Sequence, residues 1–178
     1  MSAPRDRFRD SAGSPGSSKY HWAVLAGVPL AAILFQVYVP RFVTDLAYLE
    51  LPLLVTVYFS LTFRSPVAGL LYGASVGLAQ DSLARPQHPL GMYGIVKTLV
   101  GYFTAFVSQR FDVRNSSIRA ILAFFFYFFH EFFYWVLSRA LLGEAVDFDP
   151  IRTLVRAALN GAVAAPLFLL LDKLKTTE

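Results

Sequence analysis

One lysine lies inside an apolar stretch that is long enough to cross a membrane: Lys97 is the only charged residue between Leu90 and Ser108. A charged side chain at the centre of a bilayer costs roughly 2.5–3.5 kcal/mol on insertion scales, so it is retained only where it has a partner or a task. Other polar side chains recur inside similar apolar stretches, namely Gln36, Glu50, Asp81, Glu131 and Asn160. Together these groups predict a buried polar layer.

Counting residues from one end of each stretch places these groups at a common depth. At ~1.5 Å per helical residue, Lys97 lies ~20 Å from the end of its helix that is predicted to be cytoplasmic. Glu131 and Glu50 both lie ~21 Å from the corresponding ends of theirs. The other three groups lie at roughly 18–24 Å: Asp81, Gln36 and Asn160. An unpaired charge would be expelled, so Lys97 should face Glu131, Glu50 or Asp81. Depth alone does not decide among the three, but Glu131 matches Lys97 best in height, and consecutive helices usually pack as neighbours. Two roles stay open: a structural ion-pair network, or a binding cavity or ion pathway.

Several kinds of chemistry are excluded or disfavoured. The chain has no cysteine, which excludes disulfides, thiolate metal sites and thiol nucleophiles. His130-Glu131-Phe132-Phe133-Tyr134 begins like the zinc motif H-E-x-x-H but ends in tyrosine, so the second ligand is lost. Neither a nucleophile elbow nor a phosphate-binding or dinucleotide-binding loop occurs in the sequence. We therefore expect a protein without enzymatic activity, metal or cofactor.

The composition is that of a polytopic membrane protein. The 178 residues are 56% hydrophobic and only 16% charged, whereas soluble domains carry about 25% charged residues. The apolar runs are near the length that spans a bilayer. They predict an all-α integral membrane bundle of six transmembrane helices, at 20–39, 46–63, 66–80, 89–108, 117–142 and 153–171. Residues 1–19 are predicted to be a disordered cytoplasmic tail, 20–172 the transmembrane domain and 173–178 a second cytoplasmic tail.

The basic residues predict the orientation. One face of the bundle receives ten of them: Arg5, Arg7, Arg9, Lys19, Arg64, Arg110, Arg114, Arg119, Lys173 and Lys175. The other face receives five and also an acidic loop with Glu144, Asp147 and Asp149. Because cytoplasmic loops carry the excess of Lys and Arg, both termini are predicted to be cytoplasmic. The net charge of +4 is explained by this flanking pattern, and no nucleic-acid partner is expected.

Small residues recur every fourth position in two of the predicted spans. Small side chains at this spacing let membrane helices approach closely. The two sets predict helix packing inside the monomer: Gly69, Gly73 and Gly77 in the third span, and Ala157, Gly161 and Ala165 in the sixth. In the fifth span every residue from Phe124 to Trp135 is aromatic except His130 and Glu131. This aromatic surface contacts either lipid or a partner protein.

The stretch from Pro66 through Thr104 resembles the rod shape-determining protein MreD family of bacteria. The residues that carry the resemblance are the glycines of the third span, Gln80, Asp81, Pro89, Leu90, Gly91 and the run from Lys97 to Tyr102, which includes Gly101. The resemblance implies a six-helix fold similar to the substrate-binding S-components of energy-coupling-factor transporters. It also implies a non-enzymatic, multi-pass protein of the bacterial inner membrane.

The resemblance implies partners as well. Proteins of this family associate with MreC, a single-span periplasmic coiled-coil protein, and act alongside MreB and the synthase formed by RodA and its penicillin-binding protein. The chain is thus expected to be a scaffold of the elongation machinery that supports lateral peptidoglycan synthesis and rod shape, embedded in membrane lipid. The alternative is an S-component-like substrate-binding subunit of a small-molecule transporter, with its ligand in the polar layer.

Overall fold

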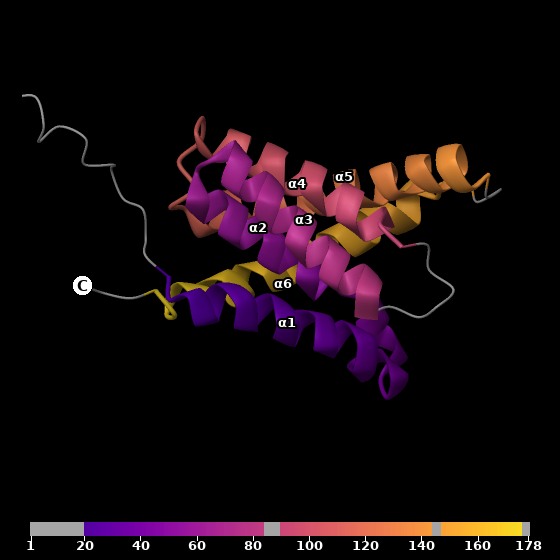
Figure 1. The fold of residues 1–178 in the computed structure, drawn as a ribbon, viewed down its shortest axis with the longest axis horizontal. Coiled ribbons are helices and arrows are strands. Elements are labelled where there is room, and N and C mark those ends of the chain that lie inside the picture. Colours follow the sequence, from indigo (N-terminus) through magenta and orange to yellow (C-terminus); the bar gives the residue numbers. More distant parts are fainter. Residues whose placement is uncertain (1–19, 84–89, 144–146, 176–178) are drawn as a thin grey trace, which may run out of the picture.

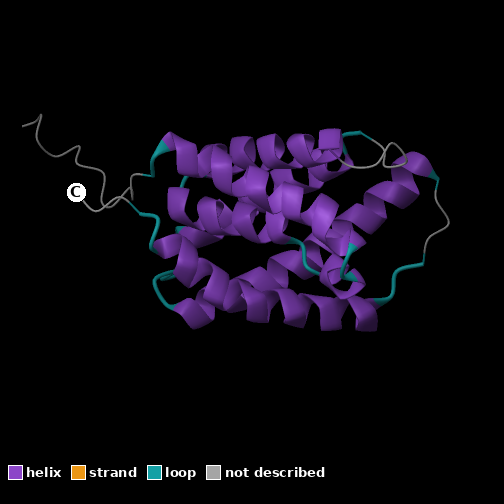
Figure 2. Ribbon diagram, turned by 90° about the horizontal axis from the view of Figure 1, so that it is seen from below, coloured by secondary structure: helices purple, strands orange, loops and turns teal. Residues whose placement is uncertain are grey.

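The computed structural model describes residues 20–83, 90–143 and 147–175. Six α-helices run along the length of one bundle (Figures 1 and 2): α1 (Trp22–Tyr38), α2 (Leu51–Phe63), α3 (Pro66–Leu83), α4 (Met92–Ser108), α5 (Ser116–Leu142) and α6 (Pro150–Asp172). Two short 3₁₀ helices, η1 (Val39–Arg41) and η2 (Thr44–Tyr48), connect α1 to α2. The described residues contain no β-strand. The all-α architecture of six helices is therefore confirmed.

Four helical stretches are long and apolar enough to cross a membrane: Trp22–Arg41, Leu46–Phe63, Ser116–Leu142 and Pro150–Asp172. α4 is a shorter apolar helix of 17 residues. α3 has 18 residues, among them three glycines and a polar C-terminal turn that contains Gln80 and Asp81. The predicted tail 1–19 lies outside the described residues, as do Glu144, Pro89 and residues 176–178 of the second predicted tail, 173–178.

The predicted second span is confirmed, since the stretch Leu46–Phe63 is long and apolar enough to cross a membrane. Within it α2 begins at Leu51, because Leu49 is extended and ends the preceding 3₁₀ turn. Three other helices depart from their predicted boundaries. The fourth helix begins at Met92 rather than Pro89, after the left-handed Gly91. The third helix continues to Leu83, three residues beyond Gln80, so Asp81 lies in its last turn. The sixth helix begins at Pro150 rather than Thr153, because the side chain of Asp149 accepts a hydrogen bond from the backbone N–H of Arg152 and caps the helix.

α2 is the central helix of the bundle. Ten consecutive residues, from Pro52 to Leu61, are buried, and α2 contacts each of the other five α-helices. The largest side chains of this core are aromatic: Tyr58 and Phe59 on α2 meet Phe168 on α6 and Tyr72 on α3. A helix that is apolar all round is stable only when it is enclosed, so the other helices form a ring around α2.

α3 and α4 pack closely along the row formed by Gly69, Gly73 and Gly77 of α3, which we call the glycine stripe. A Cβ atom on Gly69, Gly73 or Gly77 would collide with the backbone carbonyl of Gly101, Lys97 or Tyr93, respectively. The stripe therefore faces α4 inside the monomer, and each glycine lies opposite one backbone carbonyl of an equally spaced row. Two helices can approach this closely only where no side chain separates their backbones.

α5 and α6 pack through the second set of small residues. A Cβ atom on Gly161 would lie 3.0 Å from the Cβ of Phe124 and 3.3 Å from the carbonyl oxygen of Ala120. Ala157 is fully buried and Ala165 is half-buried. The aromatic run of α5 is divided between the core and the surface: Phe126 and Tyr127 are buried, whereas Phe125 and Phe132 are exposed.

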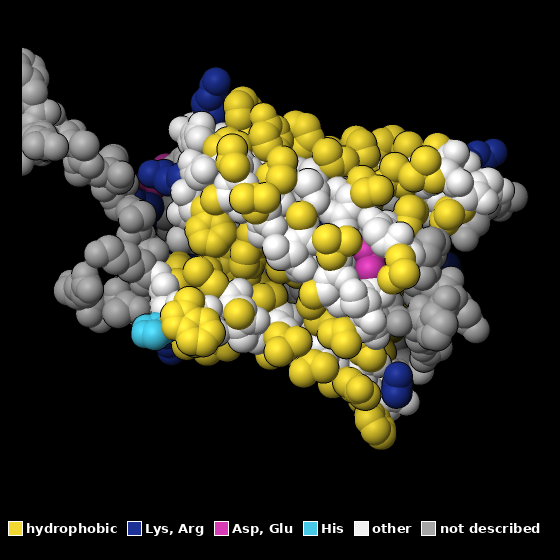
Figure 3. Space-filling view, in the orientation of Figure 1, with side chains coloured by type: hydrophobic (Ala, Val, Ile, Leu, Met, Phe, Trp, Pro, Cys, Tyr) yellow, Lys and Arg dark blue, Asp and Glu magenta, His cyan; other side chains and the backbone are white. Residues whose placement is uncertain are grey.

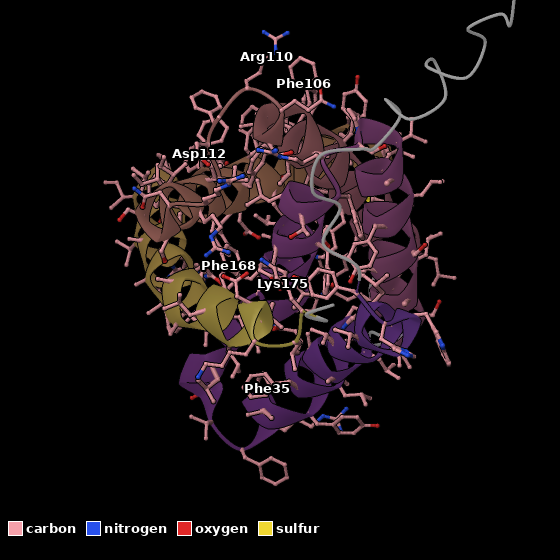
Figure 4. All side chains as sticks on the ribbon, turned by 90° about the vertical axis from the view of Figure 1, so that its left-hand side faces the viewer. Phe35, Phe106, Arg110, Asp112, Phe168 and Lys175 are labelled. Carbon is pink, nitrogen blue, oxygen red and sulfur yellow. The ribbon has the colours of Figure 1, made fainter. Side chains whose placement is uncertain are left out.

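Both ends of the described chain lie at the same end of the bundle (Figures 1 and 4). There the hydroxyl of Tyr58 donates to Asp172 Oδ1 at 2.8 Å and also bonds to the hydroxyl of Tyr20 at 2.6 Å. Asp172 forms ion pairs with Arg119 at 2.8 Å and with Lys175 at 2.6 Å. This cluster joins the first residues of the bundle to its last ones, and the sequence analysis did not identify it.

Candidate functional site

The buried lysine of α4 has its ion-pair partner in Glu50, the N-cap residue of α2. The Lys97 side chain is 0% exposed, and its Nζ lies 3.0 Å from Glu50 Oε1. Of the three carboxylates that depth left open, Lys97 thus pairs with Glu50, whereas Glu131, the best match in height, contacts His130. Glu50 is closer because it lies at the beginning of the central helix, which every outer helix faces.

Two other helices, α3 and α6, and the N-terminus of α2 hold Glu50 in place. The Nε2 of Gln80, in the last turn of α3, donates to Glu50 Oε1 at 2.9 Å. The backbone N–H of Glu50 donates to Asn160 Oδ1 of α6, also at 2.9 Å. Glu50 immediately precedes Leu51, the first residue of α2, where the helix dipole favours a negative charge. The carboxylate therefore receives a cation, an amide donor and the positive end of a helix.

His130 of α5 extends this network beyond Lys97. Its Nε2 lies 3.4 Å from Lys97 Nζ and its Nδ1 lies 3.3 Å from Glu131 Oε1. A neutral imidazole with its proton on Nδ1 satisfies both contacts, because it accepts from the ammonium and donates to the carboxylate. The ammonium also lies 4.6 Å from the ring centre of Tyr93, which adds a cation–π contact. We call the chain of Gln80, Glu50, Lys97, His130 and Glu131 the polar network.

Asp81 is buried but serves another purpose. Its Oδ2 accepts from the backbone N–H groups of Gly91 and Gly94 at 3.0 and 2.9 Å, and its Oδ1 accepts from that of Tyr93 at 3.2 Å. These donors belong to the N-terminal turn of α4, whose N–H groups have no partner within the helix. Asp81 thus caps α4 from the neighbouring helix and is not an ion-pair partner of Lys97.

The two predicted amides have different surroundings. Asn160 is fully buried, and its Nδ2 donates to the carbonyl oxygens of Tyr48 and Arg156, each at 2.9 Å. It therefore ties α6 to η2 and, through Glu50, to the polar network. Gln36 is not joined to this network: its buried Oε1 has no hydrogen-bond partner among the described residues.

The residues that carried the family resemblance have individual structural roles. Gly91 has φ +96°, a left-handed conformation that glycine adopts without strain, and it is the N-cap residue of α4. Leu90, before it, is exposed, and Pro89 lies outside the described residues. The backbones of Lys97 and Gly101 contact the glycine stripe of α3, while the side chain of Lys97 turns inward to Glu50. One motif thus specifies both the close approach of two helices and the buried ion pair.

His130 is the network residue that the sequence reasoning did not assign. It was considered only as half of an incomplete zinc motif. No group of three or more His, Asp or Glu side chains within the described residues has a geometry that could hold a metal ion. Its place directly beside Glu131, in a helix otherwise filled with aromatic residues, was the available signal.

The polar network links α2, α3, α4 and α5 through buried hydrogen bonds. A buried ion pair of this kind fixes which helices meet and in what register, because any other register leaves a charge unpaired. Glu131, whose side chain is 31% exposed, is the most accessible of its charged groups. The geometry fits the structural role better than an ion pathway.

Comparison with known proteins agrees with the motif. A family model described as rod shape-determining protein MreD matches residues 17–176, nearly the whole chain. No curated protein and no solved structure matches the chain. The motif residues Gln80, Asp81, Leu90, Gly91, Lys97 and Gly101 all lie within the matched range. The chain therefore belongs to the MreD family of rod shape-determining proteins.

Proposed function

We propose that this protein is a non-enzymatic scaffold of the bacterial inner membrane that binds MreC and thereby supports lateral peptidoglycan synthesis. Membership of the MreD family gives it a role in rod shape determination. MreC is the direct partner in this proposal, whereas MreB, RodA and the penicillin-binding protein act in the same assembly.

The observation that carries the proposal is an apolar groove on the side of the bundle. The groove has a volume of about 560 Å³ and lies between one face of α1 and one face of α3: Trp22, Leu25, Ala26, Pro29, Leu30, Ile33, Tyr72, Ser75, Val76 and Ala79. Hydrophobic side chains cover much of the face on which these helices lie (Figure 3). The lining from Trp22 to Ile33 extends ~16 Å along α1.

This groove suits a transmembrane helix. Association of helices within a bilayer depends on close packing rather than on the hydrophobic effect, and small residues permit it. Ala26, Ser75 and Ala79 supply such small positions in the groove. We assign the single transmembrane helix of MreC to it, because a single-span partner offers the bilayer one helix and the groove accepts one.

The distribution of charge supports an orientation with both termini in the cytoplasm. Arg64, Arg110 and Arg114 lie in the connections at the end of the bundle where the described chain begins and ends. The opposite end carries the acidic side chains of Asp147 and Asp149. An excess of Lys and Arg marks the cytoplasmic side of a membrane protein.

The test is co-purification of MreC with groove variants in a mild detergent. Ala26→Trp and Ala79→Trp fill the groove, and both positions are exposed, so the monomer can accommodate the new side chain. We expect each variant to lose most of the bound MreC while it keeps the melting temperature of the unaltered protein. The matched control is Ala162→Trp, an exposed position on α6 outside the groove. If the groove variants and the control retain equal amounts of MreC, this groove is not its binding site.

The alternative function is a substrate-binding subunit that resembles the S-components of energy-coupling-factor transporters. It is favoured by a polar cavity at the opposite end of the bundle from the termini, lined by α5 and α6. It predicts that a transporter ATPase module, rather than MreC, co-purifies with the protein.

A further inference from the structure

A polar cavity lies at the end of the bundle where α5 ends and α6 begins. Its volume is about 270 Å³, and it is lined by Glu131, Tyr134, Trp135, Ser138, Asp147, Phe148, Asp149, Arg152, Thr153 and Arg156. The exposed side chains of Asp147 and Arg152 place its mouth at the surface. The scaffold function does not use this cavity.

Side chains of both charges line the cavity, the acidic ones being Glu131, Asp147 and Asp149. Arg152 and Arg156 line it from α6 and are four residues apart, hence on one side of that helix. Glu131 lines it from α5. Within the described part of the chain, neither guanidinium lies within 4.0 Å of a carboxylate oxygen. Arg156 stacks on the ring of Tyr48 at 4.8 Å and Glu131 contacts His130, and these contacts leave guanidinium N–H groups and carboxylate lone pairs for a third molecule.

A buried hydroxyl in the wall points to the same conclusion. Ser138 is 3% exposed and lines the cavity, and its Oγ has no hydrogen-bond partner among the described residues. An unsatisfied buried hydroxyl costs about 1–3 kcal/mol. A polar ligand in the cavity would satisfy it.

We propose that this cavity binds a zwitterionic aminoalkyl phosphate, with the phosphate on Arg152 and Arg156 and the ammonium group on Glu131. Guanidinium groups match phosphate oxygens in charge and geometry. The N-terminal turn of α6, which contains Arg152, adds the positive end of a helix dipole. The short carbon chain between the two charges lies against Trp135 and Phe148, which form the apolar part of the wall.

Two sources carry this chemistry: the headgroup of an aminophospholipid at the membrane surface, and a free aminoalkyl phosphate. The ligand's ammonium would compete with His130, which now contacts Glu131 Oε1 at 3.3 Å. Because His130 also contacts Lys97, occupancy of the cavity would be transmitted to the polar network. The cavity thus offers the scaffold a means to sense what lies at the membrane surface.

The experiment measures binding to the purified, full-length protein in detergent, by calorimetry and by the shift in melting temperature. The probes are dihexanoyl phosphatidylethanolamine, dihexanoyl phosphatidylglycerol and phosphoethanolamine. We expect the first to bind at least about tenfold more tightly than the second, which lacks the ammonium group. Comparable binding of phosphoethanolamine would identify a free ligand as the source, and its failure to bind would identify the lipid. Equal affinity for the two lipids, or no binding of any probe, would overturn the proposal.

Variants assign the contacts. Arg152→Gln should weaken binding of dihexanoyl phosphatidylethanolamine about tenfold or more, since charge-assisted hydrogen bonds to phosphate are among the strong ones. Glu131→Gln should remove the preference for phosphatidylethanolamine over phosphatidylglycerol. The matched control is Arg139→Gln, an exposed arginine of α5 that does not line the cavity. Melting curves without ligand show that each variant is folded, and an equal loss of binding in the control would refute the assignment.

Discussion

Removal of the buried ammonium group tests the polar network most directly. Lys97→Met keeps the length and apolar bulk of a side chain that is 0% exposed, but it leaves Glu50 without its cation. Breaking a buried pair from one side costs about 3–5 kcal/mol. Glu50 keeps the hydrogen bond from Gln80 and its side chain is 13% exposed, so we expect a loss of about 3 kcal/mol. This loss lowers the equilibrium constant for folding roughly a hundredfold.

The partner is identified by a second substitution. Glu50→Gln removes the stranded charge and keeps the amide contacts, so the double variant Lys97→Met, Glu50→Gln should recover most of the lost stability. The matched control pairs Lys97→Met with Glu131→Gln, because Glu131 is more exposed and contacts only His130 within the polar network. This second pair should recover little. Denaturant unfolding in a mild detergent measures the unaltered protein and the three variants, and recovery by Glu131→Gln but not by Glu50→Gln would refute the reasoning.

Three further predictions concern packing, capping and topology. Gly73→Leu should destabilise the protein by about 3 kcal/mol, because the leucine side chain would collide with the backbone of α4. Gly27→Leu is the control: this position has open space around it, so the melting temperature should stay unchanged. Asp81→Ala should cost about 2 kcal/mol, measured by the same unfolding assay, because three N–H groups at the start of α4 lose their acceptor. In this cysteine-free chain, a cysteine at Asn115 should react with a membrane-impermeant reagent only from the cytoplasmic side and one at Asp147 only from outside; the reverse pattern would contradict the proposed orientation.

The sequence was sufficient to place the polar residues at one depth but not to pair them. Residue counting along helices gives height, and Lys97, Glu50 and Glu131 have nearly the same height. Which carboxylate meets the lysine depends on how each helix is rotated and on which helix is central. The burial of α2 on all sides depends on the packing of five other helices, and no periodicity within its own thirteen residues reveals it.

Asp81 shows the same limit in another way. Its burial near the end of a helix could be predicted, because the span predicted at 66–80 is short for a bilayer and Asp81 directly follows it. The role of Asp81 as a cap for α4 could not be predicted, because it depends on how closely α3 and α4 approach each other. The spacing of the glycines predicted that α3 packs closely against another helix. Only the structure shows which carbonyl groups of α4 they face.

The burial of α2 has a consequence for how the protein is made. The chain enters the membrane in order, and Lys97 is synthesised 47 residues after Glu50. At about 5–20 residues per second, the carboxylate waits roughly 2–9 s for its cation. During this interval α1 is the one partner helix already made and Glu50 has no counter-charge, so we expect Glu50 to be held at the membrane surface or protonated until α3 and α4 arrive. We therefore expect α2 to reach its buried position only after Lys97 has been synthesised and can pair with Glu50.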